Sequence, residues 1–311
     1  MQKEFKTKDS SISFILALVI PNVLAFFILL IAGIIVGDIT SLENTIFYKI
    51  MATLLSQAVF LSIYFYITKR KNIPLLKSYE KDKLNYKQII ILVLIALVCL
   101  FLISPIINVF DAILVELGFS TSTLPISLNK PINFIYLILT LGVLAPLSEE
   151  LLFRGIIFSG LKEKGNKTAI LISNLMFMLV HLSIHQTVYQ FILGIILALV
   201  VLYTNNIFSS ILIHFINNTF VLIINYINPY FFDYKFLSSG YIILALVLFF
   251  VAIITLYELL KMLKKQKKNN DKKPAIKCDR LVESKTETND YLKLSLVFGV
   301  ILWIITFIMT I

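Results

Sequence analysis

Long apolar stretches recur along the chain and constrain its fold more than any other feature. A helix needs about 20 mostly apolar residues to cross the roughly 30 Å hydrocarbon layer of a membrane. This pattern predicts an all-α, polytopic integral membrane protein with about nine transmembrane helices, in the range of eight to nine. The nine stretches run approximately over residues 12–36, 46–68, 88–109, 132–160, 168–186, 187–204, 207–228, 241–262 and 291–311. The fifth and sixth have almost no loop between them, so they form either a tight hairpin or a pair with a re-entrant part.

The composition agrees with a membrane protein. Of the 311 residues, 59% are hydrophobic and 15% are charged, whereas a soluble domain has about 45–50% apolar and about 25% charged residues. One soluble core cannot bury this surplus, because the surface of such a domain must still be polar. The composition therefore argues against a soluble enzyme, a nucleic-acid-binding domain and a disordered chain. The first apolar stretch is longer than the apolar region of about 7–15 residues in a cleaved signal peptide, so we expect a retained helix.

Positive charges gather in every second loop. The segments 69–87, 162–167 and 261–285 are rich in Lys and Arg, while the loops between them carry few basic residues and include Asp111 and Glu116. Lys and Arg are retained on the cytoplasmic side during membrane insertion. The alternation predicts a cytoplasmic N-terminus and an external C-terminus. The net charge of +10 therefore describes orientation, and we expect no nucleic-acid partner.

A few polar side chains interrupt the apolar stretches at membrane depth. Each one costs a few kcal/mol by insertion scales, so each needs a partner or a function. They come from three separate predicted helices, and His181 and His214 are two of the three histidines in the chain. Counted from the predicted cytoplasmic ends, Glu149, His181 and His214 lie about 10–20 Å deep. The main ones are Ser148, Glu149, Glu150, Arg154, Asn174, His181, His214, Asn217 and Asn218, and Pro146 precedes this set.

Helical geometry separates the two adjacent acids. Glu150 and Arg154 are four residues apart, so they share a face and can pair. Glu149 is rotated by about 100° from Glu150 and must face something else. Pro146 removes one backbone hydrogen bond before these acids and is expected to kink the helix. By the same spacing, Phe177 packs on His181.

The chemistry of this set favours hydrolysis. A desolvated carboxylate can take a proton from water, and His or Asn can donate to a developing oxyanion. Two histidines and a carboxylate also leave zinc open as a cofactor, with a ligand set drawn from Glu149, Glu150, His181 and His214. The sequence contains neither H-E-x-x-H nor G-x-S-x-G, so it lacks the common zinc-protease and serine-hydrolase motifs.

Three motifs on successive predicted helices carry a resemblance to a known family. They are Glu149-Glu150-x-x-x-Arg154, Phe177-x-x-x-His181 and His214-x-x-x-Asn218. In this order the motifs resemble those of the CAAX protease and bacteriocin-processing family, also called CPBP or Abi proteins. The resemblance covers roughly residues 132–225.

The resemblance implies an intramembrane endopeptidase that is open toward the cytoplasm. Glu149 would be the general base that activates a water molecule, and His181 would help to bind that water. His214 and Asn218 would stabilise the oxyanion. The resemblance also implies that Glu150, Arg154 and Phe177 have structural roles and hold these groups in position. Family members have been described both as metalloproteases and as glutamate-dependent enzymes without metal; we favour the second and expect no cofactor.

The chain is expected to divide into N-terminal membrane helices (1–131), a catalytic core (132–228), a further membrane helix (229–263), a basic cytoplasmic loop (264–290) and a C-terminal membrane helix (291–311). The residues outside the core are supported by hydropathy alone. His185 lies outside the motifs, and we expect it at the membrane edge.

The expected location is a cell membrane, and the richness in Lys, Ile, Leu and Asn favours a bacterial source. The expected partners are the bilayer and a peptide or protein substrate: a bacteriocin or signalling-peptide precursor, or a prenylated CAAX-type substrate. The oligomeric state stays open. The alternatives are a bacteriocin self-immunity or partner-binding protein without proteolysis and, less favoured because no repeat is seen, a transporter.

The predicted orientation can be tested by labelling. A Lys77→Cys variant in intact cells should resist a membrane-impermeant thiol reagent, because the basic loop is retained inside. The same variant should react after the membrane is permeabilised, which is the control for accessibility. Labelling of intact cells would contradict the orientation.

Overall fold

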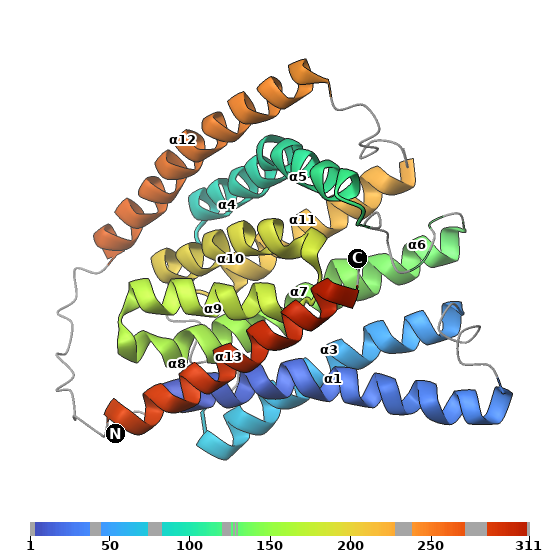
Figure 1. The fold of residues 1–311 in the computed structure, drawn as a ribbon. Coiled ribbons are helices and arrows are strands. Elements are labelled where there is room, and N and C mark those ends of the chain that lie inside the picture. Colours follow the sequence, from blue (N-terminus) through green and yellow to red (C-terminus); the bar gives the residue numbers. More distant parts are fainter. Residues whose placement is uncertain are drawn as a thin grey trace.

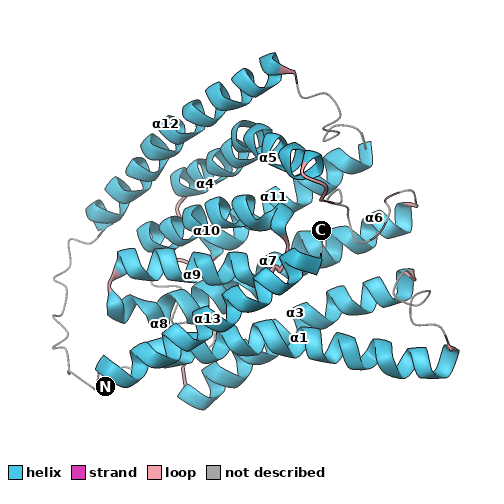
Figure 2. Ribbon diagram, viewed as in Figure 1, coloured by secondary structure: helices cyan, strands magenta, loops and turns pink. Residues whose placement is uncertain are grey.

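The computed structural model describes residues 4–37, 45–73, 83–119, 126, 128, 130–227, 238–270 and 285–309. Every regular element in these ranges is a helix, as Figure 2 shows. Successive long helices alternate in direction across the bundle (Figure 1). The α-helices are α1 (Thr7–Val36), α3 (Ile46–Lys71), α4 (Tyr86–Val98), α5 (Ser104–Glu116), α6 (Pro131–Leu137), α7 (Ala145–Glu150), α8 (Ser159–Leu161), α9 (Asn166–Val180), α10 (Ile184–Thr204), α11 (Phe208–Ile227), α12 (Ser239–Asn270) and α13 (Lys285–Met309).

Three π-helical segments join some of these helices into longer rods. Cys99–Ile103 links α4 to α5, Ile138–Leu144 links α6 to α7, and Leu151–Phe158 links α7 to α8. A π turn contains one more residue than an α turn and is often found at functional sites. The rod that carries the two acids is therefore irregular on both sides of them.

Eight of the resulting helices are long and apolar enough to cross a membrane by length and composition, among the residues described. Their outer faces carry large exposed apolar side chains, such as Ile35 at 78% and Phe47 at 73% exposure. A soluble protein rarely exposes so much apolar surface, whereas lipid chains solvate it without cost. The protein is thus a multi-pass, all-α membrane protein, as the sequence predicted.

The fifth predicted stretch differs from the prediction. It forms α9, which has 15 residues and is therefore only about 22 Å long. Here α9 stops at Val180, and Leu182 adopts a left-handed φ of 47° before α10 begins. The stretch looked longer because Leu182 in the turn and Ile184 at the start of α10 are apolar and follow α9 closely. The connection is a tight hairpin, one of the two forms that the sequence left open.

Two other predicted boundaries were wrong. The third stretch does not end at residue 109, because α5 continues to Glu116 and places Asp111 inside a helix rather than in a loop. The basic segment 264–290 is also partly helical, because α12 reaches Asn270 and α13 begins at Lys285. Residues 271–284 lie outside the described part of the chain, as do residues 74–82 of the first basic loop.

Several polar contacts tie together the helix ends that the charge pattern placed on one side. Lys71 at the end of α3 lies 2.9 Å from Asp9 near the start of α1. The backbone N–H of Thr7 donates to Glu163 at 2.9 Å, and Lys164 Nζ donates to Asn289 Oδ1 at 2.5 Å. These ends therefore meet at one end of the bundle. Which end faces the cytoplasm remains a prediction.

The core around the acids is formed by helices from the whole chain. The segment Leu151–Phe158 packs against α1, α3 and α9, and α11 packs against α4, α7, α10 and the segment Ile138–Leu144. Phe153, Ile156, Ile157 and Phe158 are all fully buried. The helices that precede the motifs in sequence thus form one wall around them.

Candidate active site

Helix α7 presents two adjacent carboxylates to different neighbours. Glu150 is fully buried and Glu149 is 8% exposed. Pro146 lies at the N-terminal end of α7, directly after the π segment Ile138–Leu144. Consecutive residues on a helix diverge by about 100°, so the two acids point in different directions.

Glu150 is held by a buried guanidinium. Arg154 Nη1 donates to Glu150 Oε1 at 3.1 Å, and both side chains are at most 1% exposed. Arg154 Nη2 also donates to the side chain of Asn174 in α9 at 3.3 Å and to the carbonyl of Gly194 in α10 at 3.0 Å. A Cβ on Gly194 would lie 2.8 Å from Asn174 Oδ1, so glycine is what lets α9 and α10 approach here. The predicted pairing of Glu150 with Arg154 is confirmed.

His214 connects the two acids. Its Nδ1 lies 3.0 Å from Glu150 Oε1, and because a carboxylate only accepts, Nδ1–H is the donor. Its Nε2 lies 3.9 Å from Glu149 Oε2. The side chain is 1% exposed. A proton on Nε2 as well would make the ring cationic, and Glu150 would stabilise that charge from the other side.

His181 approaches Glu149 from a third direction. It caps the C-terminus of α9, and its Nδ1 lies 2.7 Å from the carbonyl of Phe177, to which it must donate. Its Nε2 lies 4.0 Å from Glu149 Oε2. The Phe177 ring contacts the imidazole edge-on with centroids 4.9 Å apart, as the spacing predicted, and lies under the Arg154 guanidinium at 4.5 Å.

A gap therefore separates Glu149 from both imidazoles. The distances of 3.9 Å and 4.0 Å from Glu149 Oε2 to the two Nε2 atoms are too long for direct hydrogen bonds. A water molecule can bridge polar groups at such a separation. With Nδ1–H of His181 committed to a backbone carbonyl, its neutral ring offers Nε2 as an acceptor for that water.

Asn218 lies one turn after His214 on α11, but its amide already has a partner. Its Nδ2 donates to the backbone carbonyl of Leu141 at 2.9 Å. An amide group has two N–H bonds, so one remains for another acceptor. The geometry places Asn218 beside the π segment before α7.

Sequence reasoning missed Gln57 on α3. Its buried side chain accepts a hydrogen bond from Ser148 Oγ, next to Glu149. A glutamine on the buried side of an apolar stretch was the available signal. Helix α3 thus reaches the site although it lies outside the three motifs.

His185 is the second residue of α10 and so lies at a helix end, but its partner was not predicted. Its Nδ1 lies 3.1 Å from Asp111 Oδ1 in α5, and its side chain is 10% exposed. One turn further, the Tyr189 hydroxyl donates to Asn217 Oδ1 at 2.7 Å. These contacts join the start of α10 to α5 and to α11.

Metal binding was tested on the donor set. Among the described residues, no group of three or more His, Cys, Asp and Glu side chains has an arrangement suited to a metal ion. Glu150 and Nδ1 of His214 are already bound to each other, which leaves Glu149 and two Nε2 atoms as the groups that face one another.

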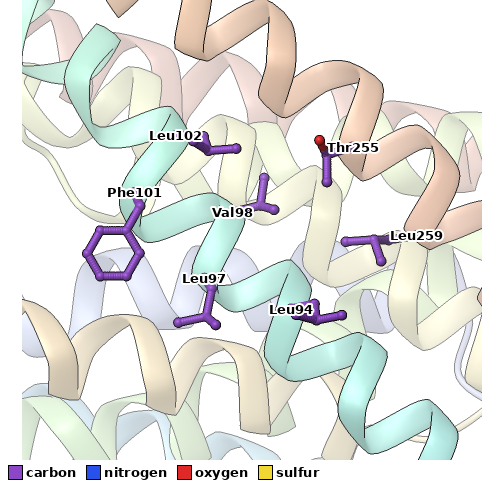
Figure 3. Close-up of a pocket in the computed structure, with 7 residues that line it drawn as sticks. All are labelled: Leu94, Leu97, Val98, Phe101, Leu102, Thr255 and Leu259. Atoms are coloured by element: carbon purple, nitrogen blue, oxygen red, sulfur yellow. The ribbon is translucent and has the colours of Figure 1, made fainter.

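A hollow of about 300 Å³ opens elsewhere, between α4 and α12 (Figure 3). Its walls are hydrocarbon apart from Thr255, whose hydroxyl donates to the carbonyl of Val251 in its own helix. None of the acids or histidines lines it. It is lined by Leu94, Leu97, Val98, Phe101, Leu102, Thr255 and Leu259. The polar cluster and this hollow are therefore separate features of the described residues.

Fold and site together define a helical membrane protein with a carboxylate and two imidazoles held inside the bundle. Residues 131–220 match the family described as type II CAAX prenyl endopeptidase Rce1-like. This match confirms the resemblance to the CAAX protease family for the segment that contains all three motifs.

A further similarity covers a shorter segment. Over 41 residues the chain is 56% identical to UPF0177 protein YxdF of Lactococcus lactis subsp. lactis (strain IL1403), which amounts to 13% of this chain and 22% of that protein. The chain thus matches less than a quarter of the length of this relative. No solved structure gives a significant match.

The buried ion pair makes a prediction about stability. Arg154→Met should destabilise the protein by about 3–5 kcal/mol, because it leaves the charge of Glu150 buried without its main partner. The double variant Glu150→Gln/Arg154→Met should lose less stability than the single variant, since no unpaired charge remains. Thermal unfolding of the purified protein in detergent measures both, and Arg70→Met, which changes an exposed arginine near the end of α3, is the matched control. Equal unfolding temperatures of the single and double variants would contradict the role of the pair.

Proposed function

We propose that the protein is an intramembrane endopeptidase that hydrolyses a peptide bond with a water molecule activated by Glu149. The observation that carries this proposal is the convergence of both Nε2 atoms on one oxygen of Glu149, at 3.9 Å and 4.0 Å. The match of residues 131–220 to a protease family supports the reaction class. Substrate, catalytic type and the role of each residue belong to the proposal.

In the first step the water lies between Glu149 and Nε2 of His181. Glu149 takes a proton from the water, and the resulting hydroxide attacks the carbonyl carbon of the scissile peptide bond. The partly buried position of Glu149 (8% exposed) keeps bulk water away from the carboxylate. His181 is held in one orientation by the carbonyl of Phe177, so it directs the lone pair of the water toward the substrate.

In the second step the tetrahedral intermediate collapses. His214 stabilises the negatively charged oxygen through Nε2–H, and Glu150 on its other side stabilises the positive ring. Glu149 then transfers its proton to the amide nitrogen, the carbon–nitrogen bond breaks, and a carboxylic acid and an amine leave. Glu149 ends in the ionised form in which it began.

The proposed substrate is a membrane-associated peptide or protein that reaches the site from the cytoplasmic side. Bacteriocin or signalling-peptide precursors and prenylated CAAX-type peptides both fit this class. A role in self-immunity or in partner binding without proteolysis is the competing function, and the experiment below separates the two.

Replacement of Glu149 tests the proposal directly. Glu149→Gln keeps the shape of the side chain but removes the base, so kcat should fall by about 10²–10⁴-fold. The purified protein in liposomes is assayed with a quenched fluorescent peptide in farnesylated and unmodified forms. A peptide extract from membranes of cells that lack the protein is assayed alongside.

The matched control is Glu258→Gln, which changes an exposed acid on α12. Undiminished cleavage by the Glu149→Gln variant would refute the proposed base. Absence of cleavage by the wild-type protein in every assay would favour the non-proteolytic role.

The proposed mechanism routes no step through a metal, and chelation checks this. Activity should persist after prolonged incubation with a chelator, and elemental analysis should find less than one zinc per protein. Loss of activity that returns on addition of zinc alone would contradict the mechanism and would favour a site formed from Glu149, His181 and His214.

A further inference from the structure

The backbone before α7 leaves one carbonyl without a helical donor. In the π segment Ile138–Leu144 the hydrogen bonds run to the fifth residue back, and the N–H of Ala145 donates to Thr140 rather than to Leu141. In this register the next donor, for the carbonyl of Leu141, would be residue 146. That residue is proline and has no N–H. An unpaired carbonyl at membrane depth is costly, because no bulk water can satisfy it.

The side chain of Asn218 fills this gap. Its Nδ2 donates to the carbonyl oxygen of Leu141 at 2.9 Å, from a different helix and 77 residues away in sequence. The amide of Asn218 thus donates to the carbonyl of Leu141, which would otherwise need an N–H from residue 146. Within α11 the other asparagine amides with a donor contact, those of Asn217 and Asn225, return to carbonyls of their own helix.

A glycine next to this carbonyl allows the contact. A Cβ on Gly142 would lie 2.9 Å from Thr219 Oγ1 and 3.9 Å from Thr219 Cα, so a larger residue would crowd the Thr219 side chain at this contact. Thr219 directly follows Asn218. The close approach of the two backbones is therefore built into both helices at the point where the hydrogen bond forms.

We propose that Asn218 is a positioning residue that replaces the backbone hydrogen bond removed by Pro146 and thereby fixes the helix that carries Glu149. Helix α11 then holds the acid-bearing rod at two points one turn apart: His214 on Glu150 and Asn218 on Leu141. This differs from the oxyanion role that the family resemblance implies for Asn218. Only the catalytic consequence rests on the proposed function; the structural role does not.

A double-mutant cycle with Pro146 tests the proposal. In Pro146→Ala the new N–H can donate to Leu141, so the bond from Asn218 becomes dispensable. Asn218→Ala alone should lower the unfolding temperature by about 2–6 °C and reduce kcat by about tenfold or more. In the Pro146→Ala background, Asn218→Ala should lower the unfolding temperature by less than about 1 °C and reduce kcat by less than about twofold.

The control is Asn225→Ala, which removes an amide that donates to a carbonyl of its own helix. This change should lower the unfolding temperature by the same amount in both backgrounds. If Asn218→Ala lowers the unfolding temperature and kcat equally with and without Pro146, the proposal is overturned and a direct role on the oxyanion is favoured. If the wild-type protein cleaves none of the peptides, the unfolding temperatures still decide the structural role. In that case dependence of the Asn218 effect on Pro146 supports this inference while the proposed function fails.

Discussion

The buried ion pair between Glu150 and Arg154 is the interaction on which the arrangement of the site depends. Both side chains are at most 1% exposed, and an unpaired charge at membrane depth costs at least a few kcal/mol. Arg154 reaches α9 through Asn174 and α10 through the carbonyl of Gly194. Glu150 reaches α11 through His214. Such a pair adds little net stability, but it strongly disfavours any packing that leaves one partner alone.

This pair also decides which acid is free. Because Arg154 and His214 both bind Glu150, the neighbouring Glu149 has no cationic partner of its own within hydrogen-bonding distance among the contacts described. It faces two imidazole nitrogens across a gap that suits a water molecule. One carboxylate is held by its partners in the bundle, and we propose that the adjacent one is the base; a rotation of about 100° along one helix separates the two.

The parts of the site that follow from local geometry could be predicted from the sequence. The pairing of Glu150 with Arg154 and the contact of Phe177 with His181 need only helical spacing. The helical membrane fold follows from the apolar stretches. The short length of α9 was not predicted, because the turn has only three residues and apolar residues resume directly after it in α10.

Features that depend on packing between distant segments were missed, because the sequence does not show which segments meet. The pairing of His185 with Asp111 joins α10 to α5, and the hydropathy pattern had placed the end of that helix before Asp111. The bond from Asn218 to Leu141 requires a π register and a close approach at Gly142, and neither is visible in the motif. Residue type shows that a polar group needs a partner, but only the fold shows which partner it finds.

The central claim is that water, activated inside the bundle, breaks a peptide bond. Its most direct test is to incubate the protein in liposomes with the membrane peptide extract in water enriched in oxygen-18. Mass spectrometry then examines every new peptide end. The account predicts peptides that appear only with the protein present and that carry one solvent oxygen in the new C-terminal carboxylate. An unchanged set of peptides, or new ends without solvent oxygen, would contradict it.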